Sequence, residues 1–288
     1  MFLTVTEKYD GGSVRDFLKT GHGFSSRLFS CLKKTDGIKL NGIPVRPGFL
    51  LKAGDRVEII FPEVWHGVQP KEGKIDILYE DEFLLGVNKP APMPCHPSAG
   101  HYEDTLANYV AAYFESRGLK TAIRIPGRLD SGTTGVVLIA KNEFVAEKLS
   151  SFTLKGEIKK KYLCVAEGML PEKGEIDLPI GRCEDSIIKR CVRQDGKAAK
   201  TVFRRITAGE DFSAAEVEIH TGRTHQIRVH MAHIGHPLVG DWLYGKEIPE
   251  QKRHLLHLWK TEFFHPVTKE KICIEAPIPE DIKSLMCL

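Results

Sequence analysis

The chain has 288 residues, of which 42% are apolar and 27% charged, a balance typical of a globular protein with a large core. Its net charge of +3 is too small to indicate a polyanionic partner. No apolar run approaches the roughly 20 residues that span a bilayer, and the N-terminus lacks a signal-peptide pattern. Seven scattered cysteines without a CxxC pair argue for reduced thiols and against a disulfide framework or a cysteine-based zinc site. We therefore expect a cytoplasmic protein that does not enter a membrane.

The first 60 residues carry a net charge of +4, so the rest of the chain is close to neutral. Apolar residues at helical spacing predict helices within residues 13–20 and 24–34, the second beginning at Ser25 or Ser26. Alternation around Asn41-Gly42 predicts a β-hairpin, and residues 53–61 predict a further strand. This small α+β unit gathers five basic residues, which form either a basic binding face or an ordinary solvated surface: Arg15, Arg27, Lys33, Lys34 and Lys39.

Residues 62–74 have no regular period and contain prolines and glycines, so we predict a linker between residues 1–61 and residues 75–288. Beyond it, residues 75–90 predict two strands, and residues 103–118 predict a helix that ends at Gly118. Further strands are predicted over residues 159–168, 199–209 and 212–221, and residues 253–266 predict a strand pair with Leu256 facing inward. Because strands dominate without βαβ alternation, the predicted fold class is α+β, with a mixed, largely antiparallel sheet flanked by helices.

Asp130 stands in a glycine-rich turn that leads directly into an apolar strand. An isolated aspartate in such a turn most often caps backbone N–H groups. Here Gly127, Gly132 and Gly135 indicate sharp bends or close packing, and the apolar run that follows anchors the end of the loop in the core. A carboxylate held in a fixed direction suits a nucleophile or a general base.

Residues 224–235 have the spacing of a helix, with Thr224 as the predicted N-cap. Arg228 lies at the edge of the apolar face of this helix. A charge in that position is costly without a carboxylate partner, and Asp130 is the partner that we expect.

Four histidines in and around this helix raise the question of a metal site: His225, His230, His233 and His236. Zinc-binding helices place two histidines four residues apart on one face, whereas His225 and His230 are rotated well away from each other. No cysteine or carboxylate completes a ligand set, so we expect hydrogen-bonded histidines and no metal.

Tyr162 opens a predicted strand after three lysines. Considered alone, it is typical of a half-buried core residue. Beside a polyanionic substrate, its ring could also stack on a base, which contributes about 1–3 kcal/mol.

Four sets of motifs extend over almost the whole chain. "GRLDSGTTG" matches a family pattern "HRLD..TSG", and residues 222–245 match "GR.HQIR.H....GHPI.GD..YG". "NKP.....HP" recurs at residues 88–97, and "R..LH" and "F.HP" recur at residues 253–257 and 263–266. These segments strongly resemble the RluA-type pseudouridine synthases. The N-terminal unit resembles the alpha-L RNA-binding domain of a small-subunit ribosomal protein, through Ser26-Arg27, Leu40-Asn41-Gly42 and Gly54-Asp55.

The resemblance implies an isomerase that breaks the bond between a uridine's ribose and ring nitrogen 1, rotates the base and rejoins it through carbon 5, with no cofactor or metal. Asp130 matches the family's catalytic aspartate, Tyr162 its base-stacking tyrosine and Arg228 the arginine that pairs with the aspartate. Leu256 is assigned to packing against the base. The apolar strand is expected to lock Asp130 in a pocket closed to bulk water, where the arginine keeps the carboxylate ionised. Attack on the anomeric carbon and removal of a ribose proton both remain open as the role of the aspartate.

The resemblance also implies which side chains contact RNA. Arg128 matches an arginine that reaches into the RNA near the target, where the base must leave its stack at a cost of a few kcal/mol. The other predicted RNA contacts are Arg223, Arg15, Arg27, Lys33 and Lys34. Two residues depart from the family pattern, because Gly127 replaces the usual histidine and Thr134 the usual serine. The first departure bears on which RNA is bound rather than on the chemistry.

The alpha-L resemblance favours ribosomal RNA over transfer RNA as the substrate, and we expect a monomer. Two rival hypotheses belong to other classes. An RNA-binding protein with a disabled site predicts the loss of at least one of Asp130, Tyr162 and Arg228. A metal-dependent hydrolase that uses the histidines predicts activity sensitive to a chelator.

Overall fold

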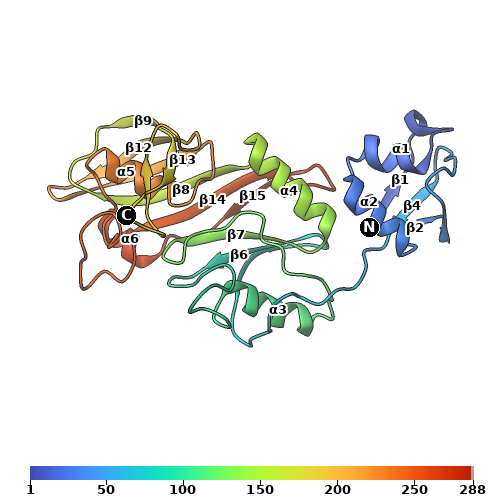
Figure 1. The fold of residues 1–288 in the computed structure, drawn as a ribbon, viewed down its shortest axis with the longest axis horizontal. Coiled ribbons are helices and arrows are strands. Elements are labelled where there is room, and N and C mark those ends of the chain that lie inside the picture. The colour runs from blue at the N-terminus through green and yellow to red at the C-terminus, as the bar shows by residue number, and fades with distance from the viewer. Residues whose placement is uncertain (287–288) are drawn as a thin grey trace.

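The computed structural model describes residues 1–286, which form a small N-terminal sheet and a much larger one (Figure 1). The small sheet is antiparallel, in the order β1-β4-β2-β3. Its strands and helices are β1 (Phe2–Thr4), η1 (Glu7–Tyr9), α1 (Val14–Asp16), η2 (Phe17–Gly21), α2 (Ser26–Lys34), β2 (Ile38–Leu40), β3 (Ile43–Pro44) and β4 (Arg56–Ile59).

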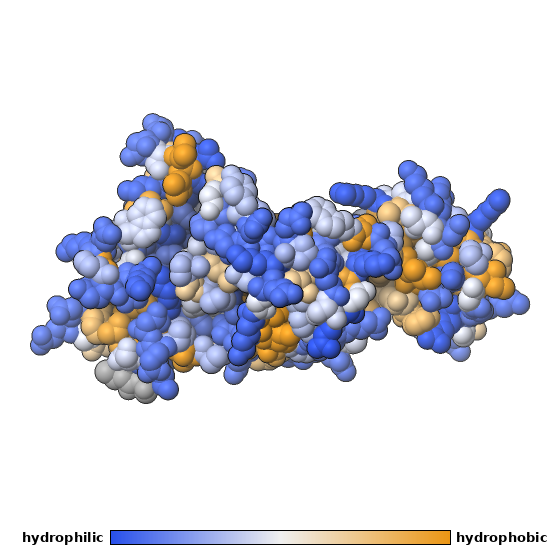
Figure 2. All heavy atoms as spheres, turned by 90° about the horizontal axis from the view of Figure 1, so that it is seen from below, coloured by the Kyte–Doolittle hydropathy of each residue, from blue (hydrophilic) through white to orange (hydrophobic). Residues whose placement is uncertain are grey.

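Local sequence explains where these N-terminal elements begin and turn. The hydroxyl of Ser25 accepts a hydrogen bond from Leu28 N at 3.1 Å, so Ser25 is the N-cap of α2. Asn41 and Gly42 both have positive φ, as the turn of the β2–β3 hairpin requires. On α2, Leu28 and Leu32 are buried while the basic side chains face solvent, which confirms the predicted amphipathic helix. Figure 2 shows hydrophilic side chains over most of one face of the whole protein, with separate apolar patches between them.

The N-terminal unit contacts the larger part through helix α4 (Glu143–Lys155). The rings of Phe24 and Phe144 stack with centroids 4.4 Å apart, and Ser25 Oγ donates to Glu147 Oε1 at 2.8 Å. The predicted linker has no helix or strand, but it packs against the larger part: His66 is buried, with Nδ1 2.7 Å from the carbonyl oxygen of Thr121.

The large sheet has the order β5-β6-β7-β14-β8-β13-β12-β9, with β15 added on β14. All its pairings are antiparallel except that of β7 with β14, which is parallel. The mixed, largely antiparallel α+β fold is therefore confirmed. The strands are β5 (Asp76–Glu80), β6 (Leu84–Lys89), β7 (Thr134–Ala140), β8 (Lys159–Glu167), β9 (Lys173–Asp177), β12 (Lys200–Ala208), β13 (Phe212–Ile219), β14 (Leu256–Phe264) and β15 (Lys271–Glu275).

The strand pair predicted over residues 253–266 is wrong, because this segment contains one continuous strand, β14. No glycine or asparagine interrupts the segment to allow a turn. Neighbouring strands β7 and β8 take up its hydrogen bonds on either side, so β14 lies in the middle of the sheet. Leu256 is buried, as predicted.

Helices and a short hairpin complete the larger part: α3 (Leu106–Ser116), α4, β10 (Ile180–Arg182), β11 (Arg190–Val192), α5 (Gln226–His233) and α6 (Glu280–Met286). Helix α3 is followed by Gly118 with φ +67°, the predicted stop. Within the described part of the chain, no helix is both long and apolar enough to cross a bilayer. Six of the seven cysteines are free thiols, and Cys287 lies outside the described residues.

Candidate active site

The loop that carries Asp130 and the start of strand β7 pack closely against residues 254–258, and glycines at two positions make this possible. A Cβ at Gly132 would lie 2.7 Å from Cε1 of His254. A Cβ at Gly135 would lie 2.1 Å from the carbonyl oxygen of Leu258, and Gly135 also has φ +113°. Side chains at these positions would push the loop away from the sheet. The glycine pattern therefore indicates close packing, as the sequence predicts.

Two buried cations hold the backbone next to Asp130. Lys89, fully buried at the end of β6, donates from Nζ to the carbonyl oxygens of Pro90, Met93 and Ser131 at 2.8, 2.7 and 3.1 Å. Burial lowers the pKa of Lys89 to about 8. On the other side, Arg253 Nη1 donates to the carbonyl oxygen of Gly132 at 3.4 Å. The direction of the Asp130 side chain is thus set by contacts from β6 and from the start of β14.

Arg228 lies beside Asp130, as predicted, with Nη1 3.3 Å from Asp130 Oδ2. Its position on the helix differs from the prediction. Helix α5 begins at Gln226, after His225 in the left-handed conformation at φ +58°, so Thr224 is not the N-cap. The side chain of Gln226 accepts from Arg223 N at 3.0 Å and holds the turn before the helix. The side chain of Arg228 is enclosed by protein, with 5% of it exposed, and does not lie at the edge of the apolar face of the helix.

The main partner of Arg228 is Asp241, which the sequence reasoning missed. Arg228 Nε and Nη2 donate to the two Asp241 carboxylate oxygens at 2.7 and 2.8 Å, a bidentate pair. Burial acts to raise the pKa of the Asp241 carboxyl, but the hydrogen bonds and charge of Arg228 outweigh it and hold that pKa below its usual value. The signal that could have identified Asp241 is the Gly-Asp pair at residues 240–241, within the motif of residues 222–245.

Asp130 is not closed off from water, which corrects the expectation of a sealed pocket. Its side chain is 28% exposed. The apolar strand β7 begins only four residues later and buries its own side chains, whereas the Asp130 side chain stays partly exposed.

Tyr162 and Leu256 lie on neighbouring strands in the centre of the sheet. Leu258 of β14 pairs with Tyr162 of β8, and Leu256 pairs with Cys164, so these four side chains share one face. Both Tyr162 and Leu256 are buried. Burial raises the pKa of the Tyr162 phenol above its ordinary value, and the nearby Asp130 carboxylate adds to the rise. The structure therefore brings Asp130, Arg228 and Tyr162 into one region, with Leu256 beside the tyrosine.

A hydrogen-bonded pair of side chains lies on the other side of Asp130. The backbone N–H of Arg190 donates to Tyr244 Oη at 2.9 Å, and Tyr244 Oη lies 2.8 Å from His225 Nδ1. One hydrogen bond joins these two side chains, donated by the hydroxyl in one imidazole tautomer and by the ring N–H in the other. His225 Nε2 lies 3.8 Å from Asp130 Oδ2. Burial lowers the pKa of His225, which favours the neutral imidazole beside the carboxylate.

Two of the other histidines of the region contact ordinary polar groups, and His233 is exposed to solvent. His230 lies 2.9 Å from Thr201 Oγ1 and 3.0 Å from the carbonyl oxygen of Leu178. His236 Nδ1 lies 2.8 Å from the carbonyl oxygen of Glu167. Among residues 1–286, no three metal-binding side chains gather in one place.

The predicted RNA contacts fall into two separate groups. Arg128 is exposed on the Asp130 loop, and Arg223 is partly buried, with Nε donating to the carbonyl oxygen of Ala198 at 3.0 Å. The remaining four are exposed on α1 and α2, at the opposite end of the protein from α5 (Figure 1): Arg15, Arg27, Lys33 and Lys34. The structure does not bring this second group to Asp130.

The two departures from the family pattern have visible consequences. Thr134 Oγ1 lies 2.8 Å from His257 Nδ1, so the threonine hydroxyl has a hydrogen-bonding partner in the core. The space beside Gly127 is occupied by Lys160, whose Nζ lies 3.0 Å from where a Cβ would stand.

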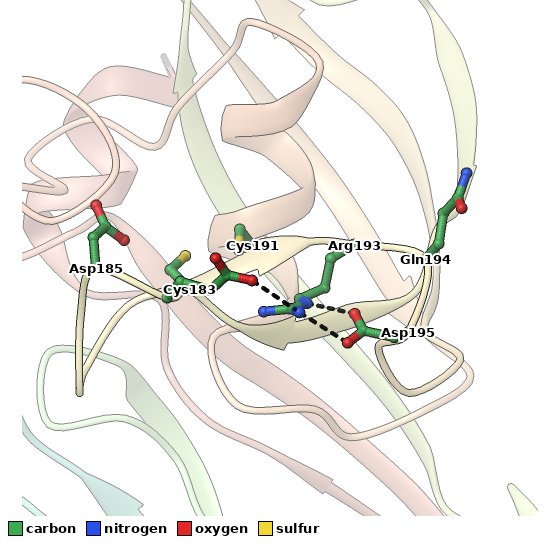
Figure 3. A pocket seen from close by; sticks show the side chains of 7 residues that line it. Cys183, Asp185, Cys191, Arg193, Gln194 and Asp195 are labelled. Atoms are coloured by element: carbon green, nitrogen blue, oxygen red, sulfur yellow. Dashed lines mark hydrogen bonds and ion pairs between the residues drawn. The ribbon is translucent and has the colours of Figure 1, made fainter.

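The β10–β11 hairpin forms a pocket that is lined by its own residues and not by those around Asp130 (Figure 3). Arg193 in its wall is bound by Asp195 at 2.8 Å and by Glu184 at 3.3 Å. Its charges are largely matched within the hairpin, and none of the predicted site residues lines it.

Comparison with known proteins shows what kind of protein this is. A sequence model described as RNA pseudouridylate synthase matches residues 84–233. The uncharacterized RNA pseudouridine synthase YjbO of Bacillus subtilis is 38% identical over 268 residues, covering 92% of this chain and 95% of that one. Ribosomal large subunit pseudouridine synthase D of Xanthomonas campestris is 36% identical over 278 residues, covering 91% and 83%.

A solved structure shares the fold. Human RNA Pseudouridylate Synthase Domain Containing 1 has a TM-score of 0.59 at 24% identity, covering 75% of this chain and 89% of that chain. The fold and the sequence matches together define an enzyme that modifies RNA. More narrowly, the chain belongs to the RNA pseudouridine synthase family and to its RluA type.

Proposed function

We propose that this enzyme converts uridine to pseudouridine in large-subunit ribosomal RNA, without a cofactor, and that Asp130 is the catalytic carboxylate. The substrate follows from similarity to relatives named ribosomal large subunit pseudouridine synthase D. In the reaction the bond from ribose C1′ to N1 breaks and a bond from C1′ to C5 forms. N1 gains a proton and C5 loses one, so the product is an isomer of the substrate.

The observation that carries this proposal is the ion pair between Arg228 and Asp130. Arg228 is fixed by Asp241 and keeps its positive charge 3.3 Å from the Asp130 carboxylate. A carboxylate in a fixed direction suits either attack on C1′ or removal of a ribose proton. Tyr162 and Leu256 form the apolar surface against which the uracil ring stacks and packs.

The N-terminal unit, residues 1–61, is proposed to anchor the RNA. Its exposed basic side chains Arg27 and Lys34 on α2 make no hydrogen bond or ion pair with the part of the chain that the structure describes. Free cations of this kind bind phosphates and release counter-ions. Replacing both with glutamate should weaken RNA binding and flatten its salt dependence, with turnover on saturating RNA nearly unchanged. Equal affinity would rule out this anchor.

The test of the main proposal is Asp130→Asn, which keeps the shape of the side chain but removes its charge. Pseudouridine would be mapped across total RNA from cells that carry the unchanged gene, the variant or no gene. We expect one or a few ribosomal sites to disappear in both altered strains, while the purified variant binds RNA as the unchanged enzyme does. Substantial residual isomerisation would refute the role of Asp130, and sites only in transfer RNA would refute the substrate.

A further inference from the structure

Three consecutive lysines at the start of β8 have three different environments. Lys159 is exposed to solvent. Lys161 lies between two carboxylates, with Nζ 3.4 Å from Glu216 and 3.4 Å from Glu218. Lys160 is partly buried and has no hydrogen bond or ion pair with any residue in the described range 1–286. Only the middle lysine therefore combines shielding from water with an unmatched charge.

The strand geometry directs Lys160 towards the candidate active site. Side chains two residues apart on a strand point to the same face, so Lys160 shares a face with Tyr162. Its Nζ lies 3.0 Å from the position of a Cβ on Gly127, three residues before Asp130. The absence of a side chain at Gly127 leaves the space that the ammonium group occupies.

The Cys95 thiol, which interacts electrostatically with Lys160, does not neutralise this ammonium. Burial raises the pKa of the Cys95 thiol, so Cys95 remains uncharged. The thiol is also engaged with the backbone of Leu129, 3.4 Å from both its nitrogen and its carbonyl oxygen. Burial lowers the pKa of Lys160, the expected effect of a cation without a counter-ion.

We propose that Lys160 binds a phosphate group of the RNA strand next to the uridine that Asp130 contacts. This inference rests on the proposed function. A partly buried cation without a partner is costly to the free protein and gains most from an anion that arrives with the substrate. In an RNA strand the anion adjoining a uridine is a backbone phosphate, and a lysine binds it as a point charge. Lys160, on strand β8, thus helps to place the nucleotide. Arg128, on the loop that carries Asp130, is exposed to solvent.

The experiment compares Lys160→Met with Lys161→Met, a matched change at a lysine whose charge is already balanced. Each is made in the full-length enzyme and again with Asp130→Asn, so that binding is measured apart from chemistry. The probe is a transcript of large-subunit ribosomal RNA, titrated at several salt concentrations. For Lys160→Met we expect about tenfold weaker binding near 0.1 M salt, with the salt slope reduced by about one. Lys161→Met should change affinity less than about twofold.

Two further variants separate binding from folding. Lys160→Arg keeps the charge and should recover most of the affinity. Gly127→Leu should displace the ammonium, so its effect should be less than additive with that of Lys160→Met. In the active enzyme Lys160→Met should raise KM about tenfold and leave kcat within about threefold.

The outcomes distinguish this inference from the proposed function. Unchanged affinity and salt slope in Lys160→Met would overturn the inference, as would equal losses in Lys160→Met and Lys161→Met. If Asp130→Asn retained turnover, the proposed function would fail while the comparison of the two lysines would still stand.

Discussion

Arg228 is bound more closely by Asp241 than by Asp130. Two hydrogen bonds of 2.7 and 2.8 Å join it to Asp241, against one contact of 3.3 Å to Asp130. Asp241 is completely buried, whereas Asp130 remains partly exposed. The guanidinium is thus positioned by Asp241, and under the proposed function the weaker contact leaves the Asp130 carboxylate free to react with the uridine.

Asp241→Asn should therefore damage both the fold and the reaction. The change leaves Arg228 buried without its main counter-ion, which costs about 3–5 kcal/mol of unfolding free energy. We expect turnover to fall at least about a hundredfold, because the cation beside Asp130 loses its fixed position. Urea unfolding and pseudouridine formation would measure the two effects. Asp177→Asn, the same change at an exposed site, should alter neither, and an unchanged unfolding free energy in Asp241→Asn would contradict the argument.

Tyr244→Phe tests the hydrogen-bond chain that ends at His225. Without the hydroxyl, His225 Nδ1 loses the hydrogen-bonding partner that favours one ring tautomer. We expect kcat to fall about three- to tenfold with little change in KM or unfolding free energy. Nitrogen NMR of the His225 ring reports which nitrogen carries the proton, and a mixture of tautomers should appear in the variant. The same protonated nitrogen in both proteins would show that Tyr244 does not set the tautomer. Tyr109→Phe serves as the control.

Two buried histidines should make the protein sensitive to acid. Burial lowers the pKa of His254 to about 3 and that of His257 to about 4. In the unfolded chain these groups bind protons below about pH 6.5, whereas in the folded protein they stay neutral. The unfolding free energy should thus be highest above pH 6.5 and fall as the pH drops, by about 2 kcal/mol per histidine at pH 5. Urea unfolding between pH 7.5 and 5 measures this.

Glutamine variants of the two histidines provide the check on that assignment. His254→Gln and His257→Gln should each lower stability at neutral pH, because packing and hydrogen bonds are lost. Each should also make the decline towards pH 5 shallower. A decline as steep as that of the unchanged protein would assign the acid sensitivity to other groups.

Gly135→Ala should be strongly destabilising. The new methyl group would lie 2.1 Å from the carbonyl oxygen of Leu258, and the backbone at φ +113° is strained for any residue with a side chain. We expect a loss of at least about 4 kcal/mol, measured by denaturant unfolding. Gly48→Ala introduces a methyl group with nothing within 4 Å and should stay within about 0.5 kcal/mol. A small effect at Gly135 would mean that β7 and β14 can separate without cost.

Several parts of the fold and site could be predicted because their signals are local. The buried strand β7, the serine-capped helix α2 and the Asn41-Gly42 hairpin follow from periodicity, capping and turn chemistry within about ten residues. Motif matching also pointed to Asp130, Tyr162 and Arg228, which lie in one region of the structure.

Other features depend on contacts between residues far apart in the chain. The strand pair predicted over residues 253–266 was wrong because alternation does not reveal that β14 has a neighbour on each side. The predicted start of α5 was wrong because His225 adopts a left-handed conformation that its sequence neighbours do not require.

Sequence periodicity was enough to predict the α+β class, and the motif resemblance was enough to predict the family and three residues that meet at the candidate site, Asp130, Tyr162 and Arg228. Only the tertiary structure decided that Asp241 is the main partner of Arg228, that Lys89 holds the Asp130 loop and that Lys160 has no counter-ion among residues 1–286. Periodicity reports which face of an element is buried, whereas the balance of charge at a site depends on which distant side chains the fold brings within a few ångströms.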